Sequence, residues 1–84
     1  MSSPFNPTTT ISYEIPVDAK IRVTVFDIRG QEIVTLAEGY KSMGHYHLQW
    51  SGLNHAGQSV STEIYFYRLI TGDTQQTIKM LYLR

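Results

Sequence analysis

Apolar and polar side chains alternate with a period of two along much of this chain, and clusters of turn-forming residues interrupt the alternation. Alternate side chains of a β-strand point to opposite faces of a sheet, so the pattern predicts half-buried strands. The first two predicted strands cover residues 8–15 and 20–26, and Pro16 ends the first because proline donates no backbone hydrogen bond. Their inward rows are Ile11, Tyr13 and Ile15, followed by Ile21, Val23 and Val25. No stretch shows the apolar spacing of a helix, so we expect an all-β fold.

Turn signals separate the remaining predicted strands. Asp27-Ile28-Arg29-Gly30 has aspartate first and glycine last, which fits a type I turn that joins two strands in a hairpin. Residues 51–62 are rich in Gly, Asn and Ser and predict a long loop with a tight turn at His55-Ala56-Gly57-Gln58. Thr71-Gly72-Asp73-Thr74 predicts a turn between the last two strands, which we expect to pair. The predicted strands after the first hairpin turn are 31–36, 45–50, 63–70 and 75–84.

Two of these strands define the expected core. Residues 63–70 are apolar on both faces, which predicts a strand that is central in its sheet and covered on both sides. In the strand 45–50, Tyr46, Leu48 and Trp50 share the face that should turn inward, and Trp50 is expected to anchor the core. About six or seven short strands with turns between them predict an immunoglobulin-like antiparallel β-sandwich.

Length and composition exclude several classes of protein. The 84 residues leave room for one domain. Lysine and arginine are scattered and the formal net charge is zero, so the basic stripe of a nucleic-acid-binding protein is missing. The absence of cysteine excludes a disulfide framework, a thiolate nucleophile and a cysteine-ligated zinc site. No apolar run approaches the ~20 residues needed to cross a bilayer, so we expect no transmembrane segment.

Residues that could support chemistry also have simpler interpretations. His45 and His47 lie two residues apart on one strand face and would suit a metal if His55 or a carboxylate came near, although we favour an exposed polar face without metal. Calcium prefers several oxygen ligands including carboxylates, and the loop 51–62 supplies none. We expect neither a nucleophilic triad nor a deep pocket, and therefore no enzyme activity and no cofactor. Structural roles, mostly at turns, are expected for Asp18, Asp27, Glu32, Glu38 and Asp73.

The aromatic residues permit two interpretations. Rings that stack on sugars would make the chain a polysaccharide-binding sandwich. At strand spacing most rings belong to a core, which we favour, and we expect only Tyr40 and Tyr82 to be exposed.

Three short patterns follow one another in an informative order. Residues 4–13 read Pro-Phe-Asn-Pro-Thr-Thr-Thr-Ile-Ser-Tyr, residues 64–69 read Ile-Tyr-Phe-Tyr-Arg-Leu, and residues 79–84 read Lys-Met-Leu-Tyr-Leu-Arg. In this order they resemble the C-terminal sorting domains of bacterial type IX secretion, whose immunoglobulin-like sandwich is similar to that of flagellar hook-capping proteins. The resemblance runs from about Pro4 to Arg84. The chain departs from the family at Ser51, where aspartate is usual, and at Glu63, where glycine is usual.

The resemblance implies a non-catalytic domain that directs a secreted cargo protein through the periplasm, across the outer membrane and to the cell surface. It implies as partners the outer-membrane secretion machinery, a sortase-like processing enzyme and an upstream cargo domain. Residues 1–7 would form the end of a linker and residues 8–84 the sorting domain. The residues that the resemblance associates with recognition are Asn6, Pro7, Ile64, Tyr65, Lys79, Met80, Leu81 and Arg84.

The last residues, 79–84, have two interpretations. They form either an edge strand whose basic ends discourage pairing between sheets, or a signal that a translocon docks by strand addition. The resemblance favours the second. For the whole chain, the alternative is an accessory polysaccharide-binding or structural module of an extracellular hydrolase or adhesin.

Overall fold

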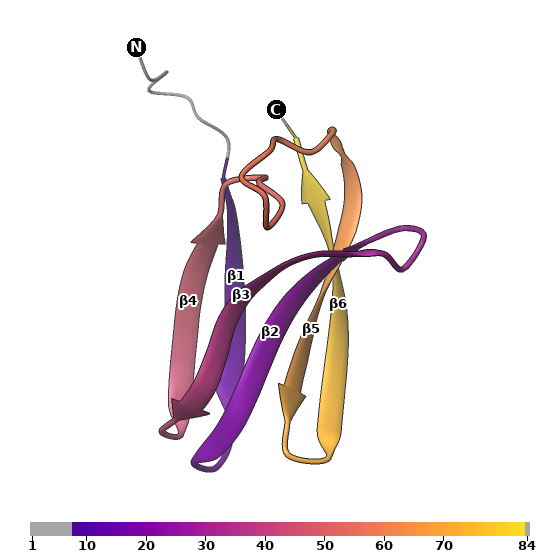
Figure 1. Cartoon of the computed structure of the whole chain (residues 1–84). Helices are drawn as coiled ribbons and strands as arrows, with labels where there is room; N and C mark the ends of the chain where they lie inside the picture. Colours follow the sequence, from indigo (N-terminus) through magenta and orange to yellow (C-terminus); the bar gives the residue numbers. More distant parts are fainter. Residues whose placement is uncertain (1–7, 84) are drawn as a thin grey trace.

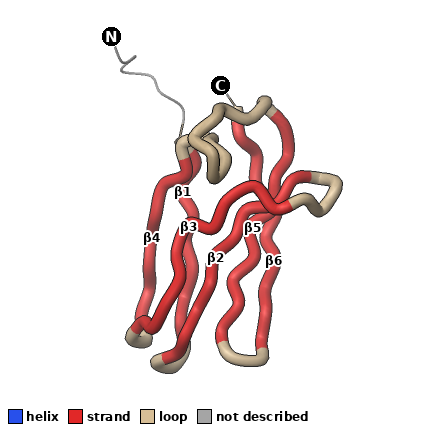
Figure 2. The backbone as a smooth tube through the Cα atoms, viewed as in Figure 1, coloured by secondary structure: helices blue, strands red, loops and turns tan. Residues whose placement is uncertain are grey.

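The structure, a computed structural model, describes residues 8–83, and these residues form two antiparallel β-sheets and no helix. A two-stranded sheet has the order β1-β4, and a four-stranded sheet has the order β3-β2-β5-β6 (Figure 1). Loops gather at the two ends of the strands (Figure 2). This arrangement confirms the predicted all-β, immunoglobulin-like sandwich. The strands are β1 (Thr9–Ile15), β2 (Ala19–Asp27), β3 (Glu32–Lys41), β4 (Gly44–Trp50), β5 (Glu63–Thr71) and β6 (Thr74–Tyr82).

The rows predicted from the period-two pattern form the centre of the core. The buried members on β1 and β2 are Ile11, Tyr13, Ile15, Ile21, Val23 and Val25. The predicted hairpin turn is also present, because the N–H of Gly30 donates to the carbonyl of Asp27 at 3.0 Å. Gly30 has a φ of 83°, a left-handed conformation that glycine adopts without strain.

One end of the core is an aromatic cluster around Trp50, which is only 2% exposed. Its ring lies 5.0 Å from that of Tyr65 and 5.2 Å from that of Tyr82, measured between centroids. The indole N–H donates to the carbonyl of Leu53 at 3.0 Å, so the single polar group of this buried side chain has a hydrogen-bond partner. The cluster thus joins β4 of one sheet to β5 and β6 of the other.

Two predictions about exposure are wrong in part. Tyr82 was expected at the surface but is 3% exposed, because its ring packs on Trp50 and its hydroxyl donates to the carbonyl of Ser51 at 3.3 Å. Tyr40, 73% exposed, fits the expectation but lies within β3 and not in a loop. The strand β5 is central in its sheet, yet its outer face is only half-buried, because among residues 8–83 no second layer of strands covers that side.

Two boundaries also differ from the prediction. The strand predicted to end at Leu36 continues to Lys41, because its ladder with β2 runs on through Gly39, which pairs with Ile21. The tight turn in the long loop covers residues 54–57, one position earlier than predicted, and is closed by a bond from the N–H of Gly57 to the carbonyl of Asn54. The side chain of Asn54 sets this position, since its Oδ1 accepts from the N–H groups of Ala56 and Gln58.

Candidate functional site

The structure brings most of the sequence-predicted recognition residues together on two neighbouring strands. Ile64 of β5 lies directly opposite Leu81 of β6, and Tyr65 lies directly opposite Met80. Lys79 is the next residue along β6. The other three predicted residues, Asn6, Pro7 and Arg84, lie outside the described residues.

The two cross-strand pairs point to opposite faces of the sheet. Tyr65 and Met80 face the core, where they are 2% and 8% exposed. Ile64 is half-buried on the outer face, and Leu81, 58% exposed, lies beside it. Lys79 is exposed as well. An external partner therefore has access to Ile64, Lys79 and Leu81, whereas Tyr65 and Met80 serve the fold.

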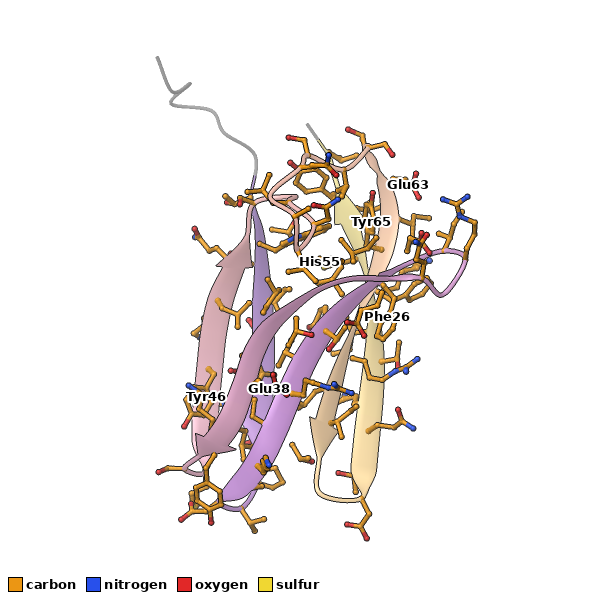
Figure 3. The ribbon with its side chains drawn as sticks, viewed as in Figure 1. Phe26, Glu38, Tyr46, His55, Glu63 and Tyr65 are labelled. Carbon is orange, nitrogen blue, oxygen red and sulfur yellow. The ribbon has the colours of Figure 1, made fainter. Side chains whose placement is uncertain are left out.

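Two phenylalanines that the sequence analysis did not assign to recognition extend this outer surface. Phe66 lies opposite Lys79 on β6 and opposite Phe26 on β2. Figure 3 labels Phe26. The Arg68 guanidinium lies over the Phe26 ring, 4.5 Å from its centroid, and covers part of it. The sequence does contain a signal for Phe66, because residues 63–70 are apolar on both faces and Phe66 belongs to the row that faces away from the core. The resulting surface is called the outer patch, and it consists of Phe26, Ile64, Phe66, Lys79 and Leu81.

The outer patch runs from β2 across β5 to one edge of the sheet, because Lys79 and Leu81 lie on β6, the last strand in the order. The described C-terminal end of β6 lies at the same end of the sandwich as the start of β1 (Figure 1). Thr9 of β1 reaches across to β6, where its hydroxyl donates to the carbonyl of Leu81 at 3.3 Å. Within residues 8–83, Lys79 has no ion-pair partner. The patch thus combines apolar side chains, one unpaired cation and a sheet edge.

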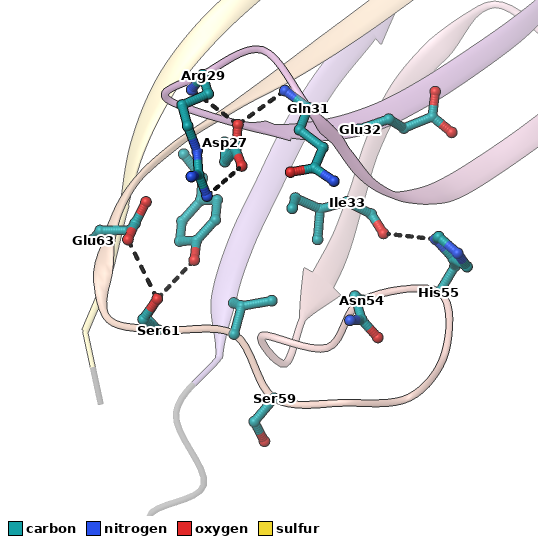
Figure 4. A pocket seen from close by; sticks show the side chains of 12 residues that line it. Asp27, Arg29, Gln31, Glu32, Ile33, Asn54, His55, Ser59, Ser61 and Glu63 are labelled. Atoms are coloured by element: carbon teal, nitrogen blue, oxygen red, sulfur yellow. Dashed lines mark hydrogen bonds and ion pairs between the residues drawn. The ribbon is translucent and has the colours of Figure 1, made fainter.

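A polar hollow of about 340 Å³ lies between the β2–β3 turn and the loop 51–62 (Figure 4). Asp27 forms its inner wall, and its Oδ1 accepts from the N–H groups of Arg29 and Gln31, both at 2.9 Å. Tyr65 pairs with Asp27 across β2 and β5, and its hydroxyl donates to the carbonyl of Ser61 at 2.8 Å. These polar groups hold the turn and the loop in place, so Asp27 has the structural role expected of it. We assign this hollow no ligand.

The histidine pair lies on the outer face of the small sheet. His45 Nε2 is 3.3 Å from a carboxylate oxygen of Glu14, and His47 Nδ1 is 3.0 Å from the hydroxyl of Ser12. His55 lies elsewhere, with its Nδ1 3.2 Å from the carbonyl of Ile33. Nowhere in residues 8–83 do three or more histidine, aspartate or glutamate side chains gather closely enough to hold a metal ion.

Burial raises the pKa of Tyr13, Tyr65 and Tyr67 above the usual value for tyrosine. For Tyr67, burial is the one cause of the raised pKa. Burial is the largest cause at Tyr13 and Tyr65 too, with a smaller contribution from neighbouring Tyr46 at Tyr13. A higher pKa moves a tyrosine further from titration at neutral pH, so these shifts reflect packing and do not indicate acid–base chemistry. In the described part of the chain there is also no helical segment with the length and hydropathy needed to cross a membrane.

Comparison with solved structures supports the fold. The chain is similar to FlgD from P. aeruginosa, with a TM-score of 0.71 and 21% sequence identity over 89% of this chain. The match spans 58% of that FlgD chain, and at this identity it shows the fold alone. A scan of protein-family models and a search of curated proteins both find no match. The predicted similarity to the sandwich of hook-capping proteins is thereby confirmed at the level of fold.

Proposed function

We propose that this domain is a non-catalytic C-terminal sorting domain, which outer-membrane export machinery recognises in order to move a cargo protein from the periplasm to the cell surface. The order of the three sequence patterns supports the proposal, and so does a fold similar to that of FlgD. Sorting of this kind needs a surface that another protein can read and needs no catalytic residues.

The outer patch is the observation that carries the proposal. Lys79 and Leu81 lie near the end of the chain on an exposed face, beside Ile64 and Phe66. Apolar side chains next to an unpaired cation suit a protein partner that offers apolar contacts and a carboxylate, because buried anchors supply most of the binding energy of an interface and complementary charges supply specificity. The residues that the resemblance associates with recognition therefore include several that a partner can reach.

A reporter fusion tests the proposal. A periplasm-directed reporter followed by residues 1–84 should be exported by a bacterium with type IX secretion. Lys79→Ala should reduce the exported fraction several-fold while leaving the domain folded. Lys20→Ala, which removes another exposed lysine from β2, should be exported like the parent. Circular dichroism and melting of the purified domains verify that each variant is folded.

A second candidate is an accessory structural module that packs against neighbouring domains, since the same fold is only part of the longer FlgD chain, of which the match spans 58%. Polysaccharide binding has less support, because most aromatic rings of the described residues lie in the core and Tyr40 is the most exposed. If the intact, folded fusion stays periplasmic in several hosts with type IX secretion, sorting is wrong and the structural module replaces it.

A further inference from the structure

The free edge of β6 is unusually regular. Nine consecutive residue pairs join β5 to β6, from Glu63–Tyr82 to Thr71–Thr74, without a register shift. β6 contains no proline or glycine, and Lys79 is its only charged residue. Sheet edges are usually protected by short strands, proline, bulges or several charges, because an unprotected edge pairs readily with another chain. β6 has little of this protection.

The opposite edge of the same sheet is protected. The ladder between β2 and β3 is interrupted by two register shifts, which bend β3. The loop 51–62 covers part of its edge, because the N–H of His55 donates to the carbonyl of Ile33 at 3.0 Å. An additional strand would therefore extend this sheet more readily at β6 than at β3.

The hairpin turn fixes which backbone groups of β6 point outward. Thr71 and Thr74 close a two-residue loop, and Gly72 has a φ of 58°, as in a type II′ turn. The closing pair of such a hairpin is hydrogen-bonded, and the bonding then alternates along the strands. The N–H and C=O groups of Gln75, Thr77, Lys79 and Leu81 accordingly point away from β5. The bond from the Thr9 hydroxyl to the Leu81 carbonyl agrees with this direction.

Three residues of β6 have outward backbone groups that can pair with an added strand. In the described part of the chain, no hydrogen bond reaches the outward backbone groups of Gln75, Thr77 or Lys79. These groups define the acceptor edge. Beside it, the half-buried Ile78 faces the inner side of the sheet, and Lys79 and Leu81 face the outer side.

We propose that the acceptor edge binds an extended strand of the export machinery, which becomes the fifth strand of this sheet. The inference rests on the proposed function and specifies its mode of recognition. The incoming strand carries a carboxylate opposite Lys79 and an apolar residue near Leu81 on one face, and an apolar residue against Ile78 on the other. Main-chain hydrogen bonds contribute affinity and these side chains contribute selectivity.

Proline at Thr77 tests the acceptor edge in the reporter fusion. The N–H of Thr77 points outward, so Thr77→Pro removes a donor from the acceptor edge and leaves the bonds between β5 and β6 in place. Thr77→Ala is the matched control, since it removes the same hydroxyl, which accepts from Arg68 Nε at 3.3 Å, but keeps the N–H. We expect Thr77→Pro to lower the exported fraction about tenfold and Thr77→Ala to be exported like the parent. Gln75→Pro with Gln75→Ala repeats the comparison if Thr77→Pro does not fold.

The outcomes separate the inference from the proposed function. If the parent fusion is exported and the folded proline and alanine variants are exported equally, the acceptor edge is wrong and sorting stands. If the parent fusion is not exported, sorting itself fails. A third outcome would overturn our assignment. Sedimentation would show that the purified parent domain dimerises and that Thr77→Pro makes it monomeric, while the reporter fusion would show unchanged export. The occupant of the edge would then be a second copy of this domain.

Discussion

Replacing Gly52 by alanine should damage this fold more than a single methyl group usually does. Gly52 is buried and has a φ of 76°. A Cβ atom there would overlap the Cζ and Oη atoms of Tyr82 and lie 2.7 Å from its Cε2 atom. Tyr82 has little room to move away, because it is 3% exposed and its ring packs against Trp50.

Two effects add in this substitution. A left-handed backbone destabilises a residue with a Cβ atom by about 1–2 kcal/mol. Overpacking a well-packed core destabilises by about 1–3 kcal/mol more. We therefore expect Gly52→Ala to lower the free energy of unfolding by about 2–5 kcal/mol. A domain of this length is stable by about 4–13 kcal/mol in total, so the variant should be near the limit of folding.

Urea denaturation of Gly52→Ala beside Gly57→Ala measures the contribution of the overlap. Gly57 has a similar φ of 80°, but a Cβ atom there would meet nothing within 4 Å. Gly57→Ala should therefore lose about 1–2 kcal/mol, the backbone contribution alone. If the two variants unfold at the same urea concentration with equal slopes, the close approach of Tyr82 does not constrain Gly52 and the argument fails.

Three further measurements test the packing and the backbone. Trp50→Ala should lower the free energy of unfolding by about 3–5 kcal/mol, and a melting temperature within a degree or two of the parent would show that Trp50 is peripheral. Glu63→Gly should destabilise by about 0.5–1 kcal/mol, because no residue other than glycine has a positive φ in the described chain; a higher denaturation midpoint would contradict this. Burial raises the pKa of Tyr13, Tyr65 and Tyr67, so the folded state favours their neutral form. Their contribution to the free energy of unfolding should be fully present below a pH of about 10, where tyrosine ionises in the unfolded chain, and should be lost as the pH rises further. Thermal melts between about pH 9 and about pH 11 check the sign, and Tyr67→Phe should reduce the loss.

The sequence predicted the parts of the fold that depend on local periodicity. The rows on β1 and β2 follow from alternation alone, and the turn at 27–30 follows from its aspartate and glycine. The end of β3 could not be predicted in this way. Glu38 and Gly39 interrupt the local pattern, and only the ladder with β2 keeps them extended.

The candidate site was predictable in its location but not in its composition. The resemblance predicts recognition residues that are neighbours in the sequence, such as Ile64 and Tyr65. Access for a partner, however, depends on the face of the sheet to which each side chain points. The register between β5 and β6 decides that face, and the register of β2 against β5 brings Phe26 beside Phe66. Such pairings join residues far apart in sequence, so a motif of neighbouring residues does not contain them.

Met80 and Leu81 provide the sharpest separation of folding from recognition, because they are adjacent in sequence and point to opposite faces. Met80, 8% exposed, packs in the core, so Met80→Ala should lower the free energy of unfolding by about 2–5 kcal/mol. Leu81, 58% exposed, should change stability by no more than about 0.5 kcal/mol when replaced by alanine. In the reporter fusion at low temperature, where both variants stay folded, Leu81→Ala should lose export and Met80→Ala should keep it. The reverse result would mean that the inward face of β6 is what the export machinery reads, and would require the strand to leave the sheet before it is recognised.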